Sequence, residues 1–165
     1  MSTNTTPNAR RAATSSLLLG LGLVAVLAGS ALATGASGFH GTPLARGTTG
    51  GAMQYNVGDI KFQTKAPVDF ATATVTIDPL GQSGWHSHPG VVLVTVTAGA
   101  VTFYQADCSY NVYAAGSSFV ESEGATGLAR NASASAPAVV YVTYIVPAGA
   151  PALRIDQPDP GCVLP

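Results

Sequence analysis

Two histidines separated by a single residue, His86 and His88, are the side chains in this sequence best suited to chemistry. They precede a segment rich in β-branched residues, from Val91 to Thr97. In an extended chain, side chains two positions apart point to the same face, so both imidazoles could bind one metal ion. The alternative is a pair of polar loop residues, because the serine between them and the Pro-Gly that follows favour a turn.

The stretch around these histidines resembles the first motif of the cupin family, which runs G, H-x-H, E and G. His86, His88 and Gly99 match this motif, and its opening glycine is displaced by one position to Gly81. The glutamate position of the motif is taken by Val92. The resemblance therefore keeps the two histidines and loses the carboxylate.

A later stretch resembles the second cupin motif, which runs G, P-x-G, H and N. Gly116, Gly124 and Asn131 match it, whereas Ser122 stands at the proline position and Gly127 at the histidine position. Together the two motifs imply an all-β fold, a small antiparallel jelly-roll barrel of the cupin type.

Metal-binding cupins hold Fe, Mn, Ni, Zn or a similar ion through three ligands of the first motif and one histidine of the second. Only His86 and His88 carry over, because Val92 has no carboxylate and Gly127 has no side chain. Catalytic metals usually need three or four protein ligands. We therefore expect an incomplete or weak metal site, which Val92→Glu together with Gly127→His should strengthen.

A third ligand would have to come from outside the motif positions. Glu121 and Glu123 are close in sequence to the lost histidine, and Asp107 or Gln105 could approach from a neighbouring strand. The pattern favours solvated loop acids at Glu121 and Glu123. His40, in a Gly/Ser/Thr-rich segment, is expected to be solvated as well.

The remaining interior of the predicted barrel is apolar and aromatic. The residues predicted to bind a small molecule are Trp85, Tyr104 and Asn131, together with His86 and His88. Aromatic side chains with a few polar groups are typical of small-molecule pockets. The same residues are also compatible with a solid core that has the two histidines at its mouth.

The first 33 residues have the layout of a secretory signal peptide. A basic pair, Arg10 and Arg11, precedes an apolar run over 17–28, and an Ala-x-Ala cleavage pattern follows at 31–33. An uncleaved membrane anchor is the alternative, but three glycines lower the hydrophobicity of the run. We expect a signal peptide at 1–33, a flexible linker at 34–51 and one cupin-like domain at 52–165.

Without the signal segment, five basic residues stand against eight acidic ones, which gives a net charge of −3. The basic residues form no cluster, so nucleic acid is not an expected partner.

In an oxidising compartment, Cys108 and Cys162 are expected to form one disulfide that fastens the Pro-rich tail to the loop around 107–110. The predicted location is secreted or extracytoplasmic, without a stable membrane anchor once the signal is cleaved, and a homodimer is compatible with the sequence.

Short apolar runs separated by Gly and Pro predict strands throughout the domain and no helix. The expected strands lie at 57–63, 70–77, 91–97, 101–106, 111–114, 118–121, 128–132 and 139–146, with Asp78-Pro79 ending the second and a tight hairpin at 98–100.

Three functions fit these observations. The first is a secreted protein that binds a small molecule, with a weak metal site. The second is a metal-dependent enzyme, such as a dioxygenase or isomerase, that uses His86, His88 and an unrecognised third ligand. The third is a structural exported barrel without a ligand.

Overall fold

The computed structural model describes residues 1–2 and 34–164. Every element described below belongs to the unit Ala31–Pro165. The predicted signal segment lies, apart from its first two residues, outside the described residues. In the part of the chain that the structure describes, no helix is long and apolar enough to cross a membrane.

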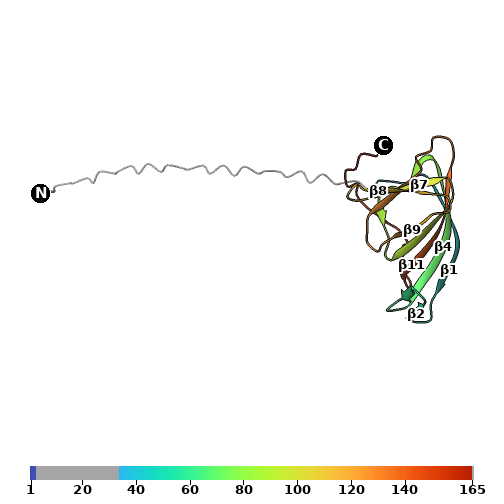
Figure 1. The fold of residues 1–165 in the computed structure, drawn as a ribbon. Coiled ribbons are helices and arrows are strands. Elements are labelled where there is room, and N and C mark those ends of the chain that lie inside the picture. Colours follow the sequence, from blue (N-terminus) through green and yellow to red (C-terminus); the bar gives the residue numbers. More distant parts are fainter. Residues whose placement is uncertain (3–33, 165) are drawn as a thin grey trace. The chain divides into compact units, whose positions relative to one another are not determined.

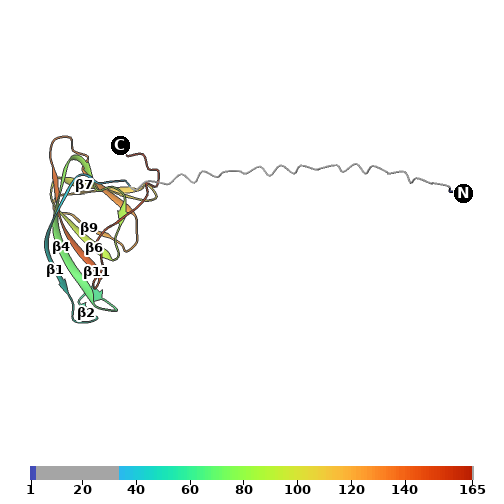
Figure 2. The ribbon, with the colours of Figure 1, turned by 180° about the vertical axis from the view of Figure 1, so that it is seen from behind.

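The described residues form twelve strands and no α-helix (Figures 1 and 2). The strands are β1 (Ser37–Thr48), β2 (Gln54–Val57), β3 (Ile60–Gln63), β4 (Val68–Gln82), β5 (His86–Ser87), β6 (Val91–Ala98), β7 (Ala100–Gln105), β8 (Tyr110–Ala114), β9 (Ser118–Glu121), β10 (Gly127–Arg130), β11 (Ala138–Pro147) and β12 (Ile155–Asp156).

The strands pair antiparallel into a nearly closed barrel. One side of it runs β1, β4, β11, β6, β9, and the other runs through β12, β5, β10, β7 and β8. A single pair, between Arg130 of β10 and Gln82 at the end of β4, joins the two sides. The predicted all-β jelly-roll barrel is therefore confirmed.

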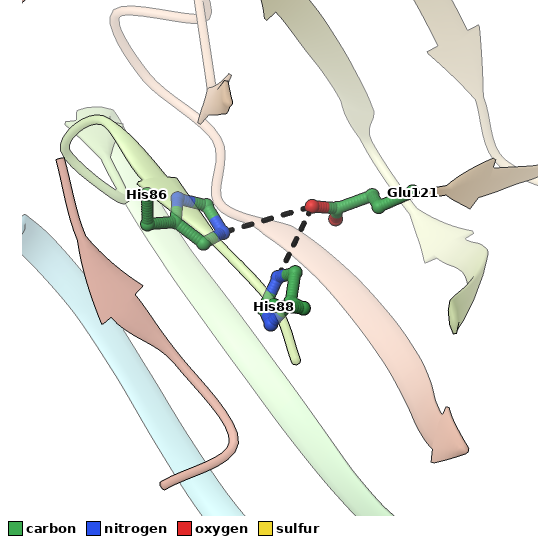
Figure 3. Close-up of side chains that lie close together, drawn as sticks. All are labelled: His86, His88 and Glu121. Atoms are coloured by element: carbon green, nitrogen blue, oxygen red, sulfur yellow. Dashed lines mark ion pairs between the residues drawn. The ribbon is translucent and has the colours of Figure 1, made fainter. Parts of the chain in front are cut away.

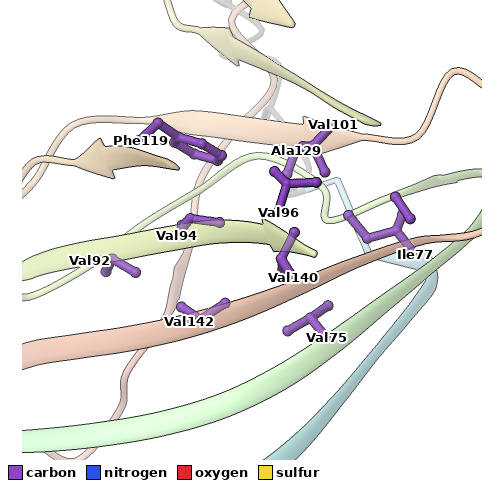
Figure 4. Close-up of a cluster of buried hydrophobic side chains, with 11 residues drawn as sticks. Val75, Ile77, Val92, Val94, Val96, Val101, Phe119, Ala129, Val140 and Val142 are labelled. Atoms are coloured by element: carbon purple, nitrogen blue, oxygen red, sulfur yellow. The ribbon is translucent and has the colours of Figure 1, made fainter. Parts of the chain in front are cut away.

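Alternation along the strands builds the core. In β6, buried valines alternate with exposed residues, as expected for a sheet with one face in the interior. Each buried valine contributes roughly 1.5–3 kcal/mol relative to an exposed one. The main core, drawn in Figure 4, consists of Val75, Ile77, Val92, Val94, Val96, Val101, Phe119, Ala129, Ala138, Val140 and Val142.

The expectation of a flexible linker at 34–51 is wrong, because most of this segment forms strand β1. This strand pairs with β4 from Ser37↔Gln82 to Thr48↔Asp69, and Phe39 packs against the main core. The Gly- and Thr-rich composition hides the strand because it carries few apolar residues to reveal a period. Pairing with the long strand β4 supplies the hydrogen bonds that order it.

Two further expectations were wrong about how neighbouring strand segments are joined. The expected strand at 57–63 is a hairpin, β2 and β3, that turns at Gly58 with φ +56°. The expected hairpin at 98–100 joins two strands that do not pair: β6 pairs with β9 and β11, whereas β7 pairs with β8 and β10. At this corner Gly99 has φ +68°, and a Cβ there would lie 2.7 Å from the carbonyl of Pro137.

Strand β4 also continues through the Asp78-Pro79 pair that was expected to end it, and extends to Gln82. Leu80 takes a positive φ of 60° there, so the chain bends without leaving the sheet. Its amide donates to Ser133 O at 2.9 Å, outside the ladder. The bend directs the chain toward the two histidines.

The predicted disulfide between Cys108 and Cys162 is confirmed, with Cα atoms 5.4 Å apart. It joins the turn between β7 and β8 to the carboxy-terminal segment, residues 153–162, which we call the strap. Cys162 packs against a second small core of Trp85, Tyr104 and Leu128. The strap therefore lies along the end of the barrel that carries the histidines.

Candidate metal centre

Strand β5 fixes the first histidine from both sides. His86 pairs with Gly127 of β10 on one side and with Asp156 of β12 in the strap on the other. His88 follows two positions later, and both residues are 4% exposed. The imidazole rings lie 4.8 Å apart between centroids, so the expectation that they share a face is met.

Both imidazoles are oriented by backbone carbonyls. The Nδ1 atom of His86 lies 2.9 Å from Gly84 O, and that of His88 lies 2.6 Å from Leu153 O in the strap. A carbonyl oxygen only accepts hydrogen bonds, so each Nδ1 carries the proton. In the neutral rings this leaves both Nε2 atoms as free electron-pair donors, which is the state that binds metals.

A carboxylate lies opposite these two nitrogens. Glu121 ends β9, its side chain is 10% exposed, and its Oε2 lies 3.2 Å from His88 Nε2 and 3.7 Å from His86 Nε2. Figure 3 shows all three side chains pointing toward one another. Three electron-pair donors that converge in this way repel one another unless a cation or a proton lies between them.

The electrostatics of the site favour a neutral first histidine. Burial lowers the pKa of His86 to about 4, and the nearby Glu121 carboxylate only partly opposes this shift. Tyr144, whose ring lies 5.5 Å from that of His88, has its pKa raised by burial and then by Glu121. At neutral pH the site therefore presents a neutral imidazole and an intact phenol beside the carboxylate.

The three side chains border a cavity of about 40 Å³ inside the barrel. Its wall is otherwise mostly apolar, with Phe39, Tyr144 and core valines, and Arg154 of the strap is the one cationic side chain among its lining residues. A single water needs on the order of 10–15 Å³ measured in this way. The cavity therefore has room for an ion and a few ligand atoms.

The structure adds Glu121 to the two histidines as a third potential ligand. The cupin motif has its glutamate at position 92, where this chain has Val92. In the structure a carboxylate comes instead from Glu121 on β9, which is the cross-strand partner of Val92. The expected solvated state of Glu121 was therefore wrong. No sequence motif signals this exchange, because it depends on the register between β6 and β9.

The second missing ligand is not replaced among the described residues that could hold a metal. A Cβ at Gly127 would overlap Cζ of Phe103. The aromatic ring therefore occupies the space that a side chain at this position would need. For that reason the expected gain of metal affinity from Gly127→His is withdrawn.

The other candidate residues lie elsewhere. Trp85 and Tyr104 pack together in the second small core, and neither of them lines the cavity. Asn131 is buried, and its amide donates to the carbonyls of Ile77, Asp78 and Ala136. The structure thus gives each of the three a packing or backbone-bonding contact, and none of them lines the cavity.

The remaining polar candidates are exposed. Asp107 accepts from Ser109, Gln105 donates to the same serine, and Glu123 lies on the surface. His40 is exposed and contacts Asp78 at 2.9 Å. His86, His88 and Glu121 are the group of potential ligands that the described part of the chain brings together.

The described strands form an antiparallel barrel, as the sequence resemblance implied. No family model matches the chain, and no curated protein matches it in sequence. Among solved structures it is similar to an uncharacterised double-stranded β-helix protein of Klebsiella pneumoniae, with 18% identity, a TM-score of 0.46, and coverage of 53% of this chain and 76% of that one.

Two enzymes are also among the similar structures. An oxalate oxidase in complex with glycolate has 21% identity and a TM-score of 0.41, with 45% of this chain and 40% of that one covered. The DMSP lyase DddQ from Ruegeria pomeroyi has 17% identity and a TM-score of 0.44, with 50% and 41% covered. The chain thus spans less than half the length of these enzymes, and the likeness concerns the fold alone.

Proposed function

We propose that this protein binds a divalent transition metal through His86, His88 and Glu121, and that the metal and the cavity beside it bind a small molecule. The convergence of two Nε2 atoms and one carboxylate oxygen in a buried site carries this proposal. A buried carboxylate facing two lone pairs is costly without a cation. A metal ion would remove that cost.

The residues fit such an ion in type, and two of the three separations between their ligand atoms are close to those expected in a metal site. Imidazole and carboxylate suit Fe, Mn, Ni and Zn. Two ligand atoms that each lie about 2.1 Å from one ion are roughly 3.0–3.4 Å apart. The distances of 3.2 and 3.7 Å from Glu121 to the histidines are close to this range. The backbone carbonyls on both Nδ1 atoms would hold the rings in the ligating tautomer.

Catalysis is a second candidate, favoured by the presence of a third ligand. Two histidines and one carboxylate leave coordination positions open to a substrate or dioxygen, and a metal bound there supplies Lewis-acid or redox chemistry. The chain itself contributes the apolar wall that excludes water and the protonated Tyr144 next to His88. A dioxygenase or isomerase reaction is compatible with this arrangement.

Export of the protein is part of the same proposal. The disulfide between Cys108 and Cys162 supports an oxidising, extracytoplasmic location. The sequence pattern at 1–33 supports a cleaved signal. Amino-terminal sequencing of protein recovered from the native host's extracytoplasmic fraction would test both, with a mature terminus near residue 34 as the expected result.

Metal analysis of the purified full-length protein tests the site. We expect one equivalent of a transition metal, or uptake of one equivalent of Co²⁺ or Zn²⁺ after chelation. Glu121→Gln should weaken binding by at least tenfold. Glu123→Gln is the matched control, because that acid is exposed and two positions away.

The alternative is an ion pair between a protonated His88 and Glu121 that needs no metal. In that case neither Co²⁺ nor Zn²⁺ would bind at stoichiometric ratio. Glu121→Gln and Glu123→Gln would then have the same metal affinity, and the proposal would fail.

A further inference from the structure

A groove of about 490 Å³ lies beside the metal centre and is lined by residues of the paired strands β1 and β4, of β11 and of the strap. It is hollow because small residues line it where a packed barrel would carry large ones. Gly41 and Ala45 of β1 and Ala71 and Ala73 of the neighbouring strand β4 are among its lining residues. The volume falls within the range of small-molecule sites, roughly 300–1,000 Å³.

The groove and the metal cavity are neighbours. Phe39, Val75 and Tyr144 line both of them, so these three side chains form the wall or gate between the two spaces. On the strap, Leu153 borders the groove and the next residue, Arg154, borders the cavity. A molecule lying in the groove therefore has one end close to the metal centre.

The two arginines near this region differ in how their charge is used. Arg46, which lines the groove, donates from Nε and Nη2 to Asp69 and from Nη2 to Ala150 O. Arg154 donates from Nε to Asp156 at 2.8 Å, and its Nη atoms have no partner among the described residues. Arg154 thus retains donors for a ligand, and a guanidinium binds a carboxylate through two parallel hydrogen bonds.

We propose that the ligand is an amphipathic monocarboxylate, whose carboxylate lies in the cavity between the metal and Arg154 and whose apolar body occupies the groove. This proposal rests on the metal site proposed above. A divalent ion with one Glu121 carboxylate leaves a positive site, to which Arg154 adds, so a monoanion is favoured. The cavity of about 40 Å³ has room for a compact head only, so the bulk of the ligand must lie outside it.

Straight-chain carboxylates provide the test. Acetate, hexanoate and decanoate would be titrated by calorimetry into the Zn²⁺-loaded full-length protein, with decan-1-ol as the uncharged comparison. Each buried methylene is expected to tighten binding by up to about fourfold. Decanoate should therefore bind at least tenfold more tightly than acetate, and decan-1-ol should bind at least tenfold more weakly than decanoate.

Two substitutions on β1 distinguish the effect of filling the groove from the general effect of adding a side chain to this strand. A Cβ at Gly41 has Val75 Cγ2, at 4.0 Å, as its one neighbour within that distance, and Gly47 has none, so both positions accept a side chain. Gly41→Leu should fill the groove and weaken decanoate at least tenfold while leaving acetate unchanged. Gly47→Leu, which lies on β1 outside the groove, should change neither.

The charge at the head is tested by Arg154→Gln, with Lys61→Gln as a surface control. Arg154→Gln should weaken all three carboxylates at least tenfold and leave decan-1-ol unchanged, and Zn²⁺ affinity would be measured separately without carboxylate. Binding that is independent of chain length, or unaffected by Gly41→Leu or Arg154→Gln, would overturn this proposal. A protein that fails to bind Zn²⁺ would instead overturn the proposed metal site.

Discussion

Glu121 lies directly opposite Val92 in the ladder between β6 and β9. Cross-strand partners project to the same face of a sheet, about 4.5–5.5 Å apart at Cβ. Val92 is fully buried and lines the metal cavity together with Glu121. The carboxylate that the first cupin motif would place at 92 is therefore provided one strand away, into the same space.

This relationship predicts that the carboxylate can be moved back. Glu121→Val should lower Zn²⁺ affinity by roughly 100-fold, since it removes one of three ligands. Adding Val92→Glu to that variant should restore affinity to within about tenfold of the original protein. Competition with a chromophoric chelator measures both changes. A double variant no better than Glu121→Val would show that the two positions are not equivalent.

Gly127 is predicted to be intolerant of any side chain. A Cβ there would overlap Cζ of Phe103 and lie 2.8 Å from its Cε2, so Gly127→Ala forces the ring to move. Overpacking of this kind costs about 1–3 kcal/mol in the free energy of unfolding. Urea denaturation measures it.

Gly47→Ala is the control for that experiment, because a Cβ at 47 has no neighbour within 4 Å. The double variant Gly127→Ala, Phe103→Leu should regain part of the loss if the ring is its cause. Equal stabilities for Gly127→Ala and Gly47→Ala would contradict the packing argument.

Much of the fold could be predicted from the sequence because it depends on local patterns. Alternating apolar residues in β6 and β11 define strands whatever their neighbours are. Strand β1 was not predicted because its Gly- and Thr-rich sequence has no alternation of apolar and polar residues. The strand is ordered by its pairing with β4. The corner at Gly99 was misread for a related reason: two adjacent strands predict a hairpin unless the sheet to which each belongs is known.

The residues of the candidate site likewise fall into those that the sequence predicts and those that it does not. His86 and His88 could be predicted, because their relative direction depends only on their spacing of two. Glu121 could not, because its place beside them depends on the register of β9 against β6, a contact between distant segments. Leu153 and Arg154 were missed for the same reason, since the strap reaches the site through its pairing with β5 and its disulfide.

Asp69 is predicted to make the fold sensitive to acid. The hydroxyl of Thr48, the guanidinium of Arg46 and the amide of Gly149 all donate to its carboxylate, and they lower its pKa below the ordinary 3.8. A folded-state pKa below the unfolded one stabilises the protein above the unfolded value, and this contribution disappears as the pH falls through the folded value.

The free energy of unfolding should therefore fall as the pH is lowered below 4. Asp69→Asn should remove that part of the pH dependence, and it should also lower the free energy of unfolding at pH 7. Unfolding in urea at a series of pH values measures this effect. Asp59→Asn, in the exposed turn between β2 and β3, is the control. A parallel pH profile for the Asp69 variant and the original protein would rule out this role.

The disulfide is predicted to stabilise both the fold and the metal centre. Cys108 and Cys162 are 54 residues apart, and closing a loop of that length is worth about 4 kcal/mol in the chain-entropy model. The strap that it anchors supplies Leu153 O, which orients His88, and β12, which pairs with β5. Loss of the disulfide should free the strap and, with it, the orientation of the second imidazole.

The double variant Cys108→Ser, Cys162→Ser should therefore lose about 2–4 kcal/mol of unfolding free energy and bind Zn²⁺ roughly tenfold more weakly under conditions where it remains folded. Calorimetric titration at 10 °C, with circular dichroism to confirm the fold, measures the metal affinity separately from the stability. Truncation after Asp159 provides the matched comparison, because it removes Cys162 but keeps Leu153, Arg154 and β12. If the strap acts only through its anchor, this truncation will weaken Zn²⁺ binding as much as the double variant does. Unchanged Zn²⁺ affinity in both would show that the strap keeps Leu153 O at His88 without the disulfide.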